Sequence, residues 1–165
     1  MSQSWQNARE KGDTMANPEH VALVKEGGAA VTKYLADNPG TKLDLSGADF
    51  HGLDLRGCNL SQSNLTGANL SGADLRTTIL GGADLRGATL RGADVRGTSL
   101  HQAKLQETDM REVSVEAIGV GRQLVCAAPH SFEGAHWDKE RLAEIIGILN
   151  LNRDWEIKYE IVPKA

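Results

Sequence analysis

Between residues 43 and 117 the chain repeats every five residues. The first blocks read LDLSG, ADFHG and LDLRG, and the central residue of every block is Leu, Phe, Val or Met. Two places before the centre stands Ala, Ser, Thr, Cys, Val or Leu, and a polar residue separates the two in nearly every block. A short fixed period is typical of a solenoid, which is built as a surface and not around a pocket.

The spacing inside each block predicts a short extended segment followed by a turn. Residues two apart point to the same side of an extended chain, so the small residue and the central Leu face inward while Asp or Asn faces outward. Many blocks end in Arg-Gly or Ser-Gly, and Gly accepts the backbone angles that turns require. A helix is excluded because a five-residue period would smear the Leu residues around it.

These blocks resemble the pentapeptide-repeat family, whose pattern is A(D/N)LXX, over fifteen consecutive blocks. The departures are few: Ile79 is apolar at an outward position, and Lys104 replaces the usual Asp or Asn. The resemblance implies an all-β solenoid, a right-handed four-sided β-helix of just under four coils. With strands stacked ~4.7–4.9 Å apart, the rod would be about 20 Å long.

The flanking sequences divide the chain into four predicted parts. We expect a flexible tail over 1–16, an N-terminal capping helix over 17–40, the β-helix over 41–117 and a C-terminal cap over 118–165. The tail has no periodicity, and Met15 is a candidate natural start. The stretch EHVALVKEGGAAV…NPG resembles the N-terminal region of many bacterial pentapeptide-repeat proteins, which implies a cap over the first coil. An open coil end exposes Leu side chains and unpaired backbone, so it needs cover.

The residues Asn17-Pro18-Glu19 predict the start of a helix, because they offer an N-cap, a first-turn Pro and a first-turn acid. We expect an interrupted amphipathic helix over 18–37 that ends at Asn38-Pro39-Gly40. Gly27 and Gly28 weaken it, by ~1 kcal/mol each relative to Ala.

The C-terminal segment leaves the repeat and predicts a small α/β cap. We expect a short strand over 123–127, an amphipathic helix over 138–149 and a half-exposed strand over 155–161. Two of these elements present apolar faces to one narrow coil end, so the sequence favours a homodimer through this segment, with a monomer as the alternative.

Composition limits the partners. The net charge of −4 and pI near 5.7 give no broad affinity for nucleic acid or membrane. No apolar stretch reaches transmembrane length, and two cysteines are too few for a disulfide framework, so a cytoplasmic protein is expected. Cys58 falls on an inward position and is predicted to be a buried small hydrophobe.

Residues twenty apart should stack on one side, which brings two sets of outward residues together. The first is a charged ladder: Asp54, Arg56, Asp74, Arg76, Asp94 and Arg96. We interpret it as a solvated salt-bridge ladder, and an Arg row for an acidic partner is the alternative.

The second set is an uncharged side with an apolar centre. Its candidate partner-contact residues are Asn59, Ser61, Ile79, Ser99 and His101, with Gln62, Gly81, Gly82 and Gln102 beside them. Uncharged surface of this kind is typical of interface cores, and chance is the rival explanation because each side samples few positions.

No catalytic, cofactor or metal site is predicted. Cys126, His130 and His136 have a spacing that matches no strong zinc pattern. No nucleophile triad, phosphate loop or paired acid in a cleft is recognisable, and a Leu-filled interior leaves no room for an active site.

The first functional hypothesis is therefore a non-catalytic scaffold that binds an unidentified protein partner. One alternative is a DNA mimic that binds gyrase, as in some family members that confer fluoroquinolone resistance. Residues 43–117 contain ten acidic and seven basic residues, a balance that disfavours imitation of a phosphate backbone. An enzyme activity in residues 118–165 is the other alternative.

Overall fold

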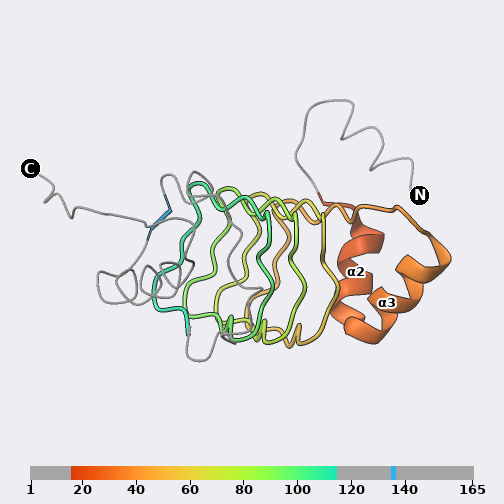
Figure 1. Ribbon diagram of the computed structural model, residues 1–165, viewed down its shortest axis with the longest axis horizontal. Coiled ribbons are helices and arrows are strands. Elements are labelled where there is room, and N and C mark those ends of the chain that lie inside the picture. Colours follow the sequence, from red (N-terminus) through yellow and green to blue (C-terminus); the bar gives the residue numbers. More distant parts are fainter. Residues whose placement is uncertain (1–15, 115–134, 137–165) are drawn as a thin grey trace, which may run out of the picture.

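The computed structural model describes residues 16–114 and 135–136. In Figure 1 the described chain winds through a stack of coils, and two helices lie at its N-terminal end. Residues 1–15 of the predicted tail, the three elements of the predicted C-terminal cap and the predicted dimer surface lie outside the described residues. The number of coils therefore stays a prediction. Ala16, the predicted end of the tail, packs against the apolar core.

Parallel backbone bridges join residues twenty positions apart, as in Asp44 with Asn64 and Asn64 with Asp84. The amide of Asn64 donates to the carbonyl of Leu43 (2.8 Å), and the carbonyl of Asn64 accepts from the amide of Leu45 (2.8 Å). Each bridging residue thus makes one bond through its N–H and one through its C=O to the coil before it. A twenty-residue turn holds four five-residue blocks, as the family resemblance implies.

The bridging residues define four faces, each named here after one member. The Asp44 face holds Asp44, Asn64, Asp84 and Lys104; the Asp49 face holds Asp49, Asn69, Thr89 and Asp109; the Asp54 face holds Asp54, Asp74, Asp94 and Ser114; the Ile79 face holds Asn59, Ile79 and Ser99. The described residues form isolated bridges and not the short strands that were expected, because each block gives two of its five residues to a turn.

The interior is filled by the inward positions of the repeat. Leu75, Leu80 and Leu85 are fully buried, with 0% exposure. Burying one such side chain stabilises the fold by roughly 1.5–3 kcal/mol, so the column of Leu residues dominates stability. Inward Thr residues are satisfied as well: the Thr78 hydroxyl donates to the carbonyl of Leu55 (2.7 Å), one coil below.

At the corners the backbone passes through the left-handed region, usually at Gly, as at Gly87 (φ 66°). Among the described residues, the corners without Gly are Gln62, Thr77, Gln102, Glu107 and Glu112, with φ between 56° and 61°. A side chain at such an angle is strained, most of all the β-branched Thr77.

The N-terminal helices are α2 (Pro18–Glu26) and α3 (Gly28–Asp37). The Asn17 side chain caps α2 by accepting from the amide of Glu19 (2.9 Å). Gly27 has φ 102° and ψ 177°, which no helix allows, so the predicted interrupted helix is two helices. No helix of the described residues is long and apolar enough to cross a membrane.

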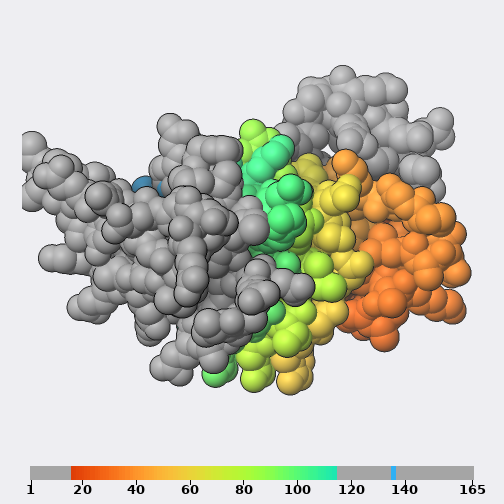
Figure 2. All heavy atoms as spheres, viewed as in Figure 1, coloured from red at the N-terminus to blue at the C-terminus, as the bar shows by residue number. Residues whose placement is uncertain are grey.

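Both helices pack against the first coil, which they adjoin in the space-filling view (Figure 2). Val24 and Val31 are buried in one apolar cluster with Leu43 and Phe50. The start of α3 lies directly on Cys58: a Cβ added at Gly28 would lie 3.3 Å from the Cys58 sulfur. Cys58 is fully buried, as predicted.

Candidate interaction surfaces

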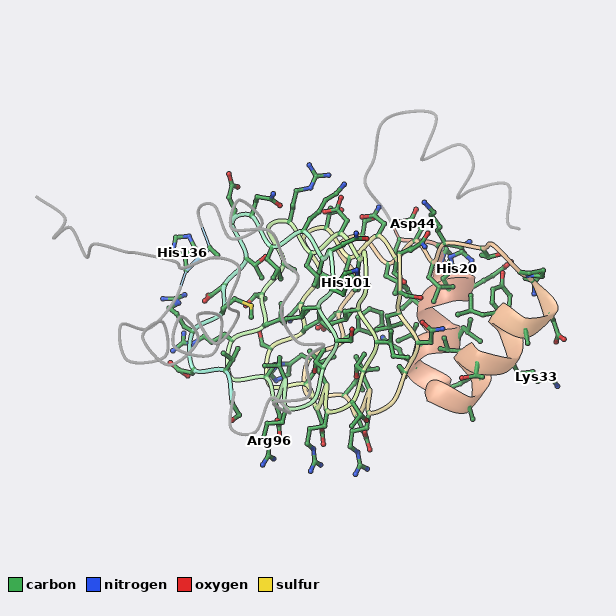
Figure 3. All side chains as sticks on the ribbon, in the orientation of Figure 1. His20, Lys33, Asp44, Arg96, His101 and His136 are labelled. Atoms are coloured by element: carbon green, nitrogen blue, oxygen red, sulfur yellow. The ribbon has the colours of Figure 1, made fainter. Side chains whose placement is uncertain are left out.

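The charged ladder forms on the Asp54 face. Arg56 donates through Nε to Asp54 Oδ1 (2.8 Å) and through a terminal nitrogen to Oδ2 (2.5 Å). Arg56 Nε also lies 3.6 Å from Asp74 Oδ2 in the next coil. Arg76 makes the same contacts with Asp74 of its own block and Asp94 of the next coil, and Arg96 pairs with Asp94 of its own block. Each guanidinium therefore pairs with the Asp of its own block, and Arg56 and Arg76 also lie near the Asp of the next coil, whereas Ser114 follows Asp94 on this face. Figure 3 shows labelled Arg96 at the edge of the stack.

These contacts favour the charged form of every carboxylate in the ladder. The side-chain hydrogen bonds from Arg56 lower the pKa of Asp54 to about 2. The pKa values of Asp74 and Asp94 are lowered for the same reason, partly opposed by desolvation. The Arg residues are about half exposed, so the ladder is a solvated set of pairs with a small net effect on stability.

The Asp-x-Arg pairing is not confined to this face. Arg86 donates to both carboxylate oxygens of Asp84, and Arg111 donates to both carboxylate oxygens of Asp109. Lys104 Nζ lies 3.6 Å from Asp84 Oδ2, and Arg91 binds Glu112. Most of the repeat charge is therefore neutralised within the surface that carries it.

The Ile79 face carries no charged residue at its described outward positions. Ile79 is 44% exposed, and among the described residues no other large hydrophobic side chain is exposed. Asn59 accepts from the amide (3.1 Å) and the hydroxyl (2.7 Å) of Ser61, so its carbonyl is already held in place. Ser99 bridges to Ile79, and His101 accepts at its backbone from Gly82 (2.7 Å). The five predicted contact residues thus lie on one side of the stack; their contact with a partner stays a prediction.

The spacing of Cys126, His130 and His136, which matches no strong zinc pattern, is not tested by the described residues. Cys126 and His130 lie outside them, and His136 forms a backbone bridge with Asp109. Within the described ranges, no group of three His, Cys, Asp or Glu residues could hold a metal ion.

An open groove lies between α2 and the first coil. It is lined by Ala16, Pro18, Val21, Ala22, Lys25, Ser46 and Gly47. Of these residues Lys25 is the one with a charge, so the groove offers no acid–base pair.

Sequence reasoning did not single out His20. This residue is 9% exposed, and its Nδ1 accepts from the backbone amide of Asp44 (3.0 Å). Its Nε2 lies 3.4 Å from the Tyr34 hydroxyl, and the two rings meet edge to face. Burial lowers the pKa of His20, against the opposing effects of Asp44 and Glu19. No local signal could have found this contact, because its partners lie on a different helix and on the first coil.

The sequence profile described as pentapeptide repeats matches residues 44–82 and 78–115, with eight copies. Together with the twenty-residue bridging register, this match shows that the chain belongs to the pentapeptide-repeat family. The family fold is a right-handed four-sided β-helix. No curated protein sequence matches the chain.

Several solved structures are similar to this chain. A pentapeptide repeat protein from the thylakoid lumen of Arabidopsis thaliana is 24% identical, with a TM-score of 0.43, over 63% of this chain and 74% of that one. Rfr23, from the cyanobacterium Cyanothece, is 28% identical with a TM-score of 0.31, over 61% of this chain and 65% of that one. QnrB1, a plasmid-mediated fluoroquinolone resistance protein, is 20% identical with a TM-score of 0.26, over 64% of this chain and 63% of that one.

Proposed function

We propose that the chain is a non-catalytic, cytoplasmic scaffold that binds a protein partner through its Ile79 face. The observation that carries the proposal is the contrast between this face and its neighbours. On the other faces most outward Asp and Arg residues are paired with one another, whereas here Ile79 is 44% exposed among uncharged side chains. Desolvating uncharged side chains and one aliphatic side chain costs less than desolvating ion pairs, so this face is the one best suited to an interface core.

The backbone of the Ile79 face is held in place by hydrogen bonds. Ile79 donates its amide to Cys58 (2.9 Å), and its carbonyl accepts from Leu60 (2.8 Å), so the backbone beneath the side chain is fixed on one edge. Gly81 follows it and adds no side chain to the surface. A partner would therefore meet a preformed surface and would order few groups on this side, which favours affinity.

A substitution pair tests this proposal. Ile79→Arg places a charge at the centre of the face, and Thr89→Arg places the same charge on the Asp49 face. Both should fold, because the corresponding outward position of the Asp44 face already holds Lys104. Affinity purification from the source cell with the unmodified chain should retain a partner that Thr89→Arg also retains and that Ile79→Arg loses. A partner that all three retain equally would contradict the role of this face.

The DNA-mimic alternative receives no support from the paired charges. A mimic needs rows of carboxylates free to imitate phosphates, but Asp54, Asp74 and Asp94 are each bound by Arg. We therefore expect no protection of DNA gyrase in a supercoiling assay with a quinolone. Protection that weakened with rising salt would favour the mimic. The enzyme alternative concerns residues outside the described part of the chain.

A further inference from the structure

The first coil has no coil before it, so its exposed edge needs other bonding partners. In later coils of the Asp44 face, the bridging residue donates its amide to a backbone carbonyl and accepts at its carbonyl from a backbone amide. For Asp84 these partners are the carbonyl of Ser63 (2.9 Å) and the amide of Leu65 (2.7 Å). No repeat precedes Asp44, so these two groups cannot come from an earlier coil and must come from another part of the chain.

The start of α2 supplies both missing groups. The amide of Asn17 donates to the carbonyl of Asp44 (3.0 Å), in place of the amide of a preceding coil. The His20 ring accepts from the amide of Asp44 (3.0 Å), in place of the carbonyl of a preceding coil. Figure 3 shows labelled His20 beside Asp44, where the helices meet the stack. The replacement differs from a carbonyl in one respect: imidazole nitrogen can take up a proton near neutral pH.

A proton on His20 Nδ1 would abolish this bond. The nitrogen would become a donor facing the donor N–H of Asp44, and that amide would lose its partner. Because Nδ1 accepts from the Asp44 amide, the hydrogen of the neutral ring is on Nε2, which faces the Tyr34 hydroxyl. A protonated ring would also be a charge in a largely buried place.

We propose that His20 is a pH-sensitive latch, which holds α2 and α3 on the first coil when its ring is neutral and releases them when the ring is protonated. Release would uncover the apolar end of the coil, including Cys58 beneath Gly28. The latch is independent of any partner on the Ile79 face.

The charged and titratable groups around the ring decide the direction of the effect. Glu19 on α2 and Asp44 on the coil favour the protonated ring, and burial disfavours it more strongly, so the pKa of docked His20 is lowered. Tyr34 on α3 offers its hydroxyl. A released His20 has an ordinary pKa near 6.5, so docking is fully favoured above that pH. Below it, the docking equilibrium weakens by up to about tenfold per pH unit until the lowered pKa is reached.

Cys58 provides a specific readout of release, because α3 covers its sulfur. The full chain carrying Cys126→Ser is labelled with a thiol reagent between about pH 7.5 and about pH 5, a range that spans the ordinary His pKa. The reagent is a pyridyl disulfide that stays reactive in acid, and each rate is divided by that of the unfolded chain at the same pH. The expected result is labelling that rises about tenfold per unit below pH 6.5 and reverses on return to neutral pH. Circular dichroism checks that the coil itself stays folded.

Two variants separate the latch from general acid effects. His20→Asn retains an oxygen that can accept from the Asp44 amide but does not titrate, so its labelling should not depend on pH. His51→Asn removes an exposed His from the same coil and should behave like the parent chain. A pH-independent parent chain, or the same pH dependence in His20→Asn, would overturn the proposal.

A second measurement covers the case in which His20→Asn fails to dock at any pH. Nuclear magnetic resonance follows the His20 ring and the Asp44 amide of the unmodified full chain through the same pH range. The latch requires both signals to change with one midpoint, below the ordinary His pKa near 6.5. An Asp44 amide that stays unchanged while His20 titrates would overturn the proposal.

Discussion

The body of the coil and its N-terminal end satisfy the same backbone groups by different means. In the body, each bridging residue bonds to the backbone of the neighbouring coil, as Asp84 does with Ser63 and Leu65. At the end, Asp44 makes these two bonds with the amide of Asn17 and the ring of His20. Repetition thus provides its own partners, and a solenoid needs side-chain chemistry only where the repetition stops.

The largest effect should come from charge inside the body. Leu75→Asp places an unpaired carboxylate at a position with 0% exposure, at a cost on the order of 5 kcal/mol or more, and should prevent folding. Arg86→Ser, on the exposed surface of the next block but one, should be nearly neutral. Thermal unfolding followed by circular dichroism measures both, and similar melting temperatures would contradict the inward register.

Removal of the N-terminal end should be the next most severe change. A chain without residues 1–40 loses Val24, Val31 and both bonds to Asp44, so the apolar coil end is exposed and should cause aggregation. A chain without residues 1–14 should remain monodisperse with unchanged stability. Light scattering compares the two, and a soluble, monodisperse product of the longer deletion would remove the capping role from these helices.

A smaller change tests the contact between helix and coil directly. Gly28→Leu cannot fit over Cys58, whose sulfur would lie 3.3 Å from the new Cβ, and should weaken docking by about 1–3 kcal/mol. Ala29→Leu places the same side chain at the adjacent exposed position and should be neutral. Labelling of Cys58 at neutral pH reports the difference. Equal labelling of both variants would mean that α3 does not need this close approach.

The smallest effect concerns the corners of the body. Thr77 has φ 59°, so Thr77→Gly should relieve strain and stabilise the fold by about 1 kcal/mol, even though it loses the local bond from its hydroxyl. The reverse change at a comparable corner, Gly87→Ala, should destabilise it by about 1 kcal/mol. Denaturant unfolding measures both, and a destabilised Thr77→Gly would show that the hydroxyl bond outweighs the strain.

The body of the fold could be predicted because its rules are local. Inward and outward positions alternate, so the burial of Leu75 and the exposure of Ile79 both follow from the five-residue register. The helix start at Asn17 and the break at Gly27 could be read in the same way, from residue types at fixed offsets. The extent of strand structure could not be predicted, because a resemblance in sequence motif does not show how many residues take part in each bridge.

The contacts at the ends could not be predicted, because they depend on where a non-repeating segment returns to the coil. His20 meets Asp44 across 24 positions of sequence. At the other end the amide of His136 donates to Thr108 (2.8 Å) and its carbonyl accepts from Met110 (2.8 Å). In a strict repeat residue 129 would make these bonds, because it stands twenty positions after Asp109. The observed partner lies seven residues further along the chain, and the five-residue period does not predict this offset.

The corners without Gly are unevenly distributed along the stack. Gly holds every corner from 82 to 97, whereas the next three corners are Gln102, Glu107 and Glu112, all with positive φ. Each stores on the order of 1–3 kcal/mol of backbone strain, and in a solenoid such a cost is shared only with adjacent coils. The last described repeats should therefore be less stable than the repeats with Gly corners. Under mechanical load or mild denaturant, these last repeats should unfold first.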